Sequence, residues 1–258
     1  MVQADIAREN KAKNMARFFN LSDRKAKDAD LIVFPEMFST GFTMNTRLAE
    51  TMDGETVKQL QAFANEKNTL VMTSLIIKEN QQFYNRLLAV FPDGRIQYYN
   101  KRHLFSFANE DKYYLAGKNQ LIVSWQGWKI MPLVCYDLRF PVWSRNTMDY
   151  DLLVYVANWP ERRRFAWQSL LVARAIENQC FTVGVNRIGK DHNDVEHAGD
   201  SVVLNPFGEK ISNINPHEEK VELIMIEHKT IESYRKKFNF LADSDKFTIL
   251  QRDAFGKN

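Results

Sequence analysis

A single cysteine stands where a buried strand would deliver a nucleophile. Cys135 follows the mostly apolar residues 128–134 and precedes Tyr136-Asp137-Leu138-Arg139, a pattern that predicts a strand, a sharp turn and a helix. A thiol at such a turn meets free backbone N–H groups and the positive end of the helix dipole, and both favour the thiolate. The chemistry indicated is acyl transfer. Taken alone, a cysteine in a core strand is more often an inert buried thiol.

Two charged residues stand at the ends of other apolar segments. Glu36 closes the run 31–35, and Lys101 follows Tyr98-Tyr99-Asn100 among aromatic and aliphatic neighbours. A charge carried into an apolar site is costly unless it is paired or functional. Taken by themselves, these two residues could equally form a structural ion pair.

The order of these residues resembles a known catalytic triad. A Glu after Val-Phe-Pro, a Lys in Asn-Lys-Arg-His-Leu-Phe and a Cys in Leu-Val-Cys-Tyr-Asp-Leu-Arg-Phe-Pro are similar to the Glu-Lys-Cys set of the nitrilase superfamily of carbon–nitrogen hydrolases. Glu110, seven residues before Gly117, stands where many members carry a further active-site carboxylate. Similar segments at 157–160, 173–179 and 199–208 extend the resemblance over nearly the whole chain.

Within the superfamily, three segments most resemble the bacterial omega-amidase branch: 35–42, 101–105 and 142–146. The resemblance implies hydrolysis of the terminal amide of small dicarboxylic monoamides such as 2-oxoglutaramate and succinamate. Two alternatives stay open. Another amidase or a nitrile hydrolase would keep the same triad, and a non-catalytic binding or regulatory relative would keep the fold.

The resemblance also assigns roles. Glu36 would act as general base towards the Cys135 thiol, and a thioester acyl-enzyme would form. The ammonium of Lys101 and the backbone N–H of Tyr136 would stabilise the oxyanion, at about 3 kcal/mol for each donor. Glu110 would orient Lys101 or the amide nitrogen.

The far carboxylate of such a substrate calls for a cation in the pocket. Arg163 is the candidate, since an arginine can hold a carboxylate through two hydrogen bonds. Phe42 and Trp159 are candidates for the pocket walls. Each has an alternative: residues 162–164 could be a solvated helix turn, and both aromatic residues could belong to the core.

Composition predicts a cytoplasmic enzyme with free thiols at Cys135 and Cys180. The net charge of +3, from 35 basic and 32 acidic residues, predicts neither a nucleic-acid nor a membrane partner. No segment approaches the ~18 apolar residues of a membrane span. The five histidines lack metal-ligand spacing and the ten glycines form no phosphate loop, so we expect no metal and no cofactor.

Hydrophobic periodicity predicts an α/β protein in one domain, residues 1–258. Helices are expected at 7–27, 56–67, from 141 and at 163–179. Strands are expected at 2–6, 70–77, 82–91, 95–99, 121–124, 128–134, 152–156, 181–185, 201–204, 209–211 and 221–227. The resemblance sharpens this to a four-layer α-β-β-α sandwich that pairs as a homodimer through helices and the apolar tail 238–247.

Overall fold

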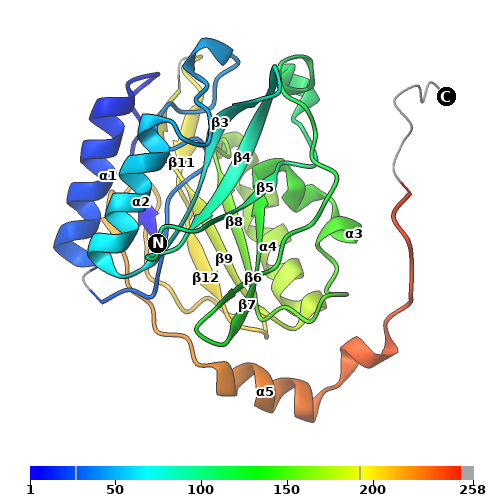
Figure 1. Cartoon of the computed structure of the whole chain (residues 1–258). Helices are drawn as coiled ribbons and strands as arrows, with labels where there is room; N and C mark the ends of the chain where they lie inside the picture. Colours follow the sequence, from blue (N-terminus) through cyan, green and yellow to red (C-terminus); the bar gives the residue numbers. More distant parts are fainter. Residues whose placement is uncertain (27, 192, 251–258) are drawn as a thin grey trace.

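The computed structural model describes residues 1–26, 28–191 and 193–250. Two β-sheets lie at its centre, with strand orders β2-β3-β4-β5 and β12-β9-β8-β7-β6. Helices α1 and α2 cover the outer face of the first sheet, and α4 covers the outer face of the second (Figure 1). The predicted four-layer α-β-β-α sandwich is confirmed.

The first sheet mixes one parallel and two antiparallel pairs. Its strands are β2 (Leu31–Val33), β3 (Leu70–Glu79), β4 (Gln82–Val90) and β5 (Ile96–Asn100). The helices over it are α1 (Lys11–Lys25) and α2 (Glu55–Lys67). A tight turn at Gly94, whose φ is +85°, joins the antiparallel strands β4 and β5, as Pro92-Asp93-Gly94 predicts.

The second sheet has three parallel strands at its centre. Its strands are β6 (Val123–Trp125), β7 (Trp128–Val134), β8 (Leu152–Ala157), β9 (Phe181–Asn186) and β12 (Val202–Leu204). The helices on this side are α3 (Pro141–Ser144) and α4 (Arg164–Asn178). Because β7, β8 and β9 are parallel, the residues that follow them emerge at one edge of the sheet.

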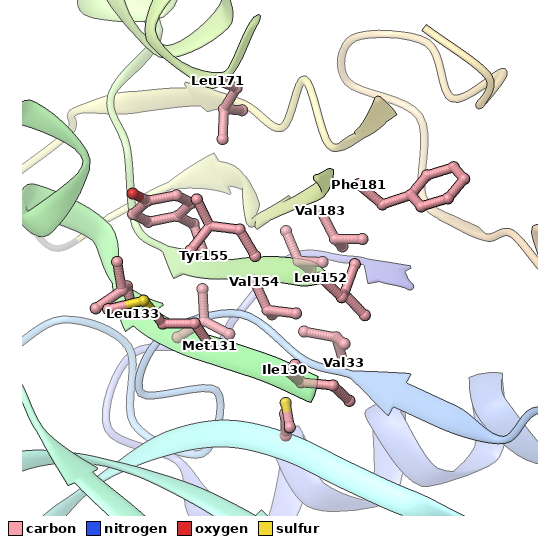
Figure 2. Close-up of a cluster of buried hydrophobic side chains, with 14 of the residues drawn as sticks. Val33, Ile130, Met131, Leu133, Leu152, Val154, Tyr155, Leu171, Phe181 and Val183 are labelled. Carbon is pink, nitrogen blue, oxygen red and sulfur yellow. The ribbon is translucent and has the colours of Figure 1, made fainter. Parts of the chain in front are cut away.

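The core between the sheets is built from the inward-facing residues of both. Val33 of β2 belongs to the same buried cluster as Ile130, Leu152 and Val154 of the second sheet (Figure 2). Burial of each such side chain contributes about 1.5–3 kcal/mol relative to exposure. This packing fixes the two sheets against each other and so fixes the distance between residues at their edges.

The prediction of a strand over 221–227 is wrong. Only Lys220–Val221 (β13) pairs, with Val2–Gln3 (β1), so the predicted strand at 2–6 is also shorter. Beyond Glu222 the side chains alternate as in an edge strand, but none of the described strands pairs with them, and Met225 is 86% exposed. The predicted strand at 209–211 is reduced to one bridge, at Lys210.

Two small elements were not predicted. The hairpin β10 (Ile188–Lys190) and β11 (Glu196–Ala198) is too short to show an alternating pattern. Helix α5 (His228–Lys237) buries only Ile231, so it has almost no apolar face to recognise. Among the described residues, no helix combines the length and apolarity needed to cross a bilayer.

Candidate active site

A cavity of about 590 Å³ opens at the edge where the parallel strands end. The structure brings to it seven of the eight predicted site residues: Glu36, Phe42, Lys101, Cys135, Tyr136, Trp159 and Arg163. The eighth, Glu110, lies directly behind Lys101 and is completely buried. Residues separated by up to 127 positions in sequence thus share one site.

Lys101 follows β5 and forms ion pairs with two buried carboxylates. Its Nζ lies 2.9 Å from Oε1 of Glu36 and 2.9 Å from Oε2 of Glu110. Burial alone would disfavour the ammonium, but the charges of Glu110 and Glu36 outweigh it and raise the pKa of Lys101. Burial also raises the pKa of Glu110, with Glu36 adding to the effect and Lys101 opposing it. The two carboxylates therefore favour the charged form of Lys101 in this site.

Glu36 is held from the opposite sheet. Its Oε2 accepts a hydrogen bond of 2.9 Å from the backbone N–H of Asn158, the residue after β8. The side-chain Nδ2 of Asn158 donates to the backbone oxygen of Glu36 at 2.6 Å. This double contact fixes the carboxylate relative to β8 and to its neighbour β7, the strand that Cys135 follows. Asn158 lies in the segment 157–160 that resembles the family, but the sequence did not indicate this role.

Cys135 occupies a strained turn after β7. Its φ is +46°, in the left-handed region that few non-glycine residues adopt, and the chain continues as a single five-residue 3₁₀ turn, Cys135–Arg139. Burial, with the charge of Glu36 as the next cause, raises the pKa of the Cys135 thiol well above its ordinary value, while Lys101 opposes the shift. The expectation that the turn favours the thiolate is wrong, because so short a helix cannot offset burial beside a carboxylate.

Two further buried polar residues, Asp137 and Asn85, support the site and were missed by sequence reasoning. Asp137 accepts hydrogen bonds from the Tyr99 hydroxyl at 2.8 Å and from the Val134 backbone N–H at 3.0 Å. Asn85 of β4 donates through Nδ2 to Glu36 at 2.7 Å and to Glu110 at 3.0 Å. The available signal was a polar residue within a predicted strand for Asn85, and within the turn after a predicted strand for Asp137.

The predicted pocket residues surround the opening. The Phe42 ring lies 5.4 Å from Nζ of Lys101, and Trp159 is packed under the guanidinium of Arg139 at 5.0 Å. The Arg163 guanidinium lies 5.0 Å from the ring of Phe105. Burial, with neighbouring Arg162 as the next cause, lowers the pKa of Arg163. In the part of the chain that the structure describes, no carboxylate forms an ion pair with Arg163.

The site offers a thiol, a carboxylate base and a fixed ammonium around one cavity. No group of three or more potential metal ligands occurs among residues 1–26, 28–191 and 193–250. His103 packs flat on Phe140, with ring centroids 3.7 Å apart, and bonds to Asp137, so its contacts are structural. The arrangement suits nucleophilic attack by sulfur on a carbonyl carbon, with proton transfer to a carboxylate.

Comparison with known proteins agrees with this chemistry. The carbon–nitrogen hydrolase family matches residues 1–236. Omega-amidase YafV of Escherichia coli (strain K12) is 45% identical over 220 residues, which cover 85% of this chain and 86% of that protein. The 2-oxoglutaramate amidase of Bacillus subtilis (strain 168) is 34% identical over 213 residues, which cover 80% and 82%.

A solved structure of a carbon–nitrogen hydrolase is also similar to this chain. The crystal structure of XC1258 from Xanthomonas campestris, described as a CN-hydrolase superfamily protein with an arsenic adduct in the active site, is 40% identical in sequence. The two structures superpose with a TM-score of 0.94 over 96% of this chain and 97% of that one. The chain therefore belongs to the carbon–nitrogen hydrolase family, and it is a hydrolase of amide carbon–nitrogen bonds other than peptide bonds.

Proposed function

We propose that the protein is an omega-amidase, which hydrolyses the terminal amide of small dicarboxylic monoamides such as 2-oxoglutaramate and succinamate. The observation that carries the proposal is a half-buried Arg163 at the wall of the cavity that holds Cys135, without an ion-pair partner among the described residues. A substrate carboxylate would supply that partner. The names of the relatives in Escherichia coli and Bacillus subtilis support the same substrate class.

The first half of the reaction forms an acyl-enzyme. Glu36 takes the thiol proton of Cys135 while sulfur bonds to the amide carbon, so the neutral thiol needs no prior ionisation. The oxyanion is stabilised by the ammonium of Lys101 and the backbone N–H of Tyr136. Glu36 then passes its proton to the amide nitrogen, the carbon–nitrogen bond breaks, and ammonia leaves a thioester on Cys135.

The second half releases the acid. Glu36 takes a proton from water as the water oxygen bonds to the thioester carbon, and the same two donors stabilise the second oxyanion. The carbon–sulfur bond then breaks, and the proton on Glu36 returns to the sulfur of Cys135. Glu110 does not exchange protons in this scheme. It orients the Lys101 ammonium through the contacts at 2.9 and 3.1 Å.

The test is ammonia release from 2-oxoglutaramate by the purified protein, beside the variants Cys135→Ala and Cys180→Ala. Cys180 is fully buried and away from the cavity, so it is the matched control. We expect release by the wild type and by Cys180→Ala, and none by Cys135→Ala. Release no greater than that of Cys135→Ala would refute the substrate and direct the search to other amides and to nitriles.

A further inference from the structure

Asn85 contacts Glu36, Lys101 and Glu110. It is completely buried in β4, opposite Ile76 of β3. Its backbone carbonyl oxygen accepts a hydrogen bond of 2.9 Å from the backbone N–H of Lys101. Its side-chain Nδ2 donates to Oε1 of Glu36 at 2.7 Å and to Oε1 of Glu110 at 3.0 Å. One neutral amide therefore bridges two carboxylates.

The amide orientation follows from its surroundings. Nδ2 carries two hydrogens, one for each carboxylate oxygen, whereas Oδ1 has no hydrogen-bond partner among the described residues. A flipped amide would place Oδ1 against the two anionic oxygens and would leave Nδ2 without an acceptor. That arrangement is unfavourable in a buried site. Asn85 therefore requires both oxygens to act as acceptors.

A count of hydrogen bonds separates the two carboxylates. A carboxylate has about four acceptor positions, two on each oxygen. In Glu110, Oε1 accepts from Asn85 and Lys101, and Oε2 accepts from Lys101 and from the backbone N–H of Phe105, so all four are occupied. In Glu36, Oε1 likewise accepts from Asn85 and Lys101.

The second carboxylate oxygen of Glu36, Oε2, has fewer hydrogen bonds than the other three. Oε2 of Glu36 accepts one hydrogen bond within the described part of the chain, from Asn158, so one acceptor position is left for a proton. We propose that Asn85 is a positioning residue that occupies Oε1 of both carboxylates and so directs the proton of Cys135 to Oε2 of Glu36. The inference rests on the proposed amide hydrolysis and adds the route of the proton within it.

The residue type fits this task. An aspartate at position 85 would add a third negative charge and lose both donors, while a lysine or arginine would add a second cation and hold the base too firmly. A leucine would have a similar volume but no donor. Only a short side-chain amide supplies two hydrogen bonds to two separate carboxylates without changing the charge of the site.

The experiment compares Asn85→Leu with Asn178→Leu across pH. Asn178 of α4 is also completely buried and hydrogen-bonded, but it is not at the cavity, so it is the matched control for lost stability. Loss of a hydrogen bond to an anion makes protonation of that anion easier. We therefore expect the acid limb of kcat/KM in Asn85→Leu to move up by about one to two pH units. Asn178→Leu should keep the wild-type pH profile.

An unchanged acid limb in Asn85→Leu, with only a lower melting temperature like that of Asn178→Leu, would overturn the inference. If Asn85→Leu does not fold, Asn85→Asp serves instead. The added negative charge should move the acid limb up further, and an unmoved limb would again refute the role.

The result does not depend on the substrate assignment. If the wild type releases no ammonia from omega-amides, the proposed substrate fails, but the rate of Cys135 alkylation by iodoacetamide still reports the protonation of its base. The acid limb of that rate should move up in Asn85→Leu and stay in place in Asn178→Leu. A limb that stays in place in both variants would refute the positioning role.

Discussion

Asp137 and His103 are joined twice: Oδ1 of Asp137 lies 2.9 Å from the backbone nitrogen of His103 and 2.8 Å from its ring Nδ1. Asp137 stands two residues after Cys135, and His103 stands two residues after Lys101. The nucleophile and the ammonium come from different sheets, so this contact ties together the two turns that carry them. The distance between thiol and ammonium then depends on a carboxylate outside the reaction itself.

Replacement of Asp137 by alanine should damage both stability and turnover. The substitution leaves several buried donors without an acceptor, which costs about 1–3 kcal/mol for each unsatisfied group. We expect a free energy of unfolding lowered by about 3 kcal/mol or more, and a lower kcat in the folded fraction. Denaturant unfolding and steady-state kinetics measure the two effects. Asp30→Ala, at an exposed acid whose backbone is not left-handed, is the control and should change neither.

Glu36→Gln and Glu110→Gln should differ in severity. Glutamine cannot accept the thiol proton, so Glu36→Gln should lower kcat by about 10²–10⁴-fold. Glu110→Gln leaves Lys101 paired with Glu36 and leaves the proton acceptor intact, so its loss should be smaller. Single-turnover acylation rates compare them directly. Equal losses would mean that Glu110 also takes part in proton transfer.

Arg163→Ala should affect carboxylate-bearing substrates selectively. A charge-assisted hydrogen bond is worth about 1.5–3 kcal/mol, so kcat/KM for succinamate should fall by about 10–100-fold. A neutral amide of similar length should be hydrolysed as by the wild type. The control is Arg47→Ala, at an exposed arginine that does not line the cavity, which should stay within about twofold. Equal losses on both amides would assign Arg163 to packing.

Alkylation of Cys135 should become faster at alkaline pH. Burial, with the charge of Glu36 as the next cause, raises the pKa of this thiol, so the neutral thiol predominates near pH 7 and the thiolate fraction grows as pH rises. Burial also raises the pKa of Cys180 to about 12. Mass spectrometry after iodoacetamide treatment should show label on Cys135 that increases with pH, and little on Cys180, because Cys135 lines the cavity whereas Cys180 is fully buried away from it. A rate that stays constant into the alkaline range would contradict the raised pKa.

The homodimer remains a prediction that solution measurements can check. Phe240 is 57% exposed and Phe247 is 43% exposed in the tail after α5, and Phe165 of α4 is 80% exposed. A second copy would cover such apolar side chains. Light scattering coupled to size-exclusion chromatography should give twice the 30.2 kDa of one chain. A mass of one chain at micromolar concentration would refute the dimer.

The sequence predicted the elements that bury a continuous apolar face. Strands β3, β4, β7, β8 and β9 were recognisable from their apolar runs, and the resemblance added the layer order. Residues 222–227 could not be predicted, because an alternating pattern does not reveal whether a partner strand exists. Glu36, Lys101 and Cys135 were found because each stands at the end of an apolar segment, and the other site residues were suggested by the resemblance.

The supporting residues were harder to predict because their partners are distant in sequence. Asn85 bonds to residues 49 positions before it and 25 after it, and Asp137 bonds to residues 34 and 38 positions away. A single sequence shows that such a polar residue lies in an apolar strand or turn, but not which groups it faces. The predicted direction of the Cys135 pKa shift was wrong because the burial that raises this pKa depends on residues brought together only in the folded protein.

The left-handed backbone at Cys135 sets catalysis against stability. A residue with a side chain at φ +46° costs roughly 1–2 kcal/mol relative to glycine, which adopts this conformation freely. Selection for stability alone would therefore favour glycine at position 135. That replacement would remove the thiol that we propose as the nucleophile. If Cys135 is the nucleophile as proposed, a more stable but inactive protein lies one substitution away.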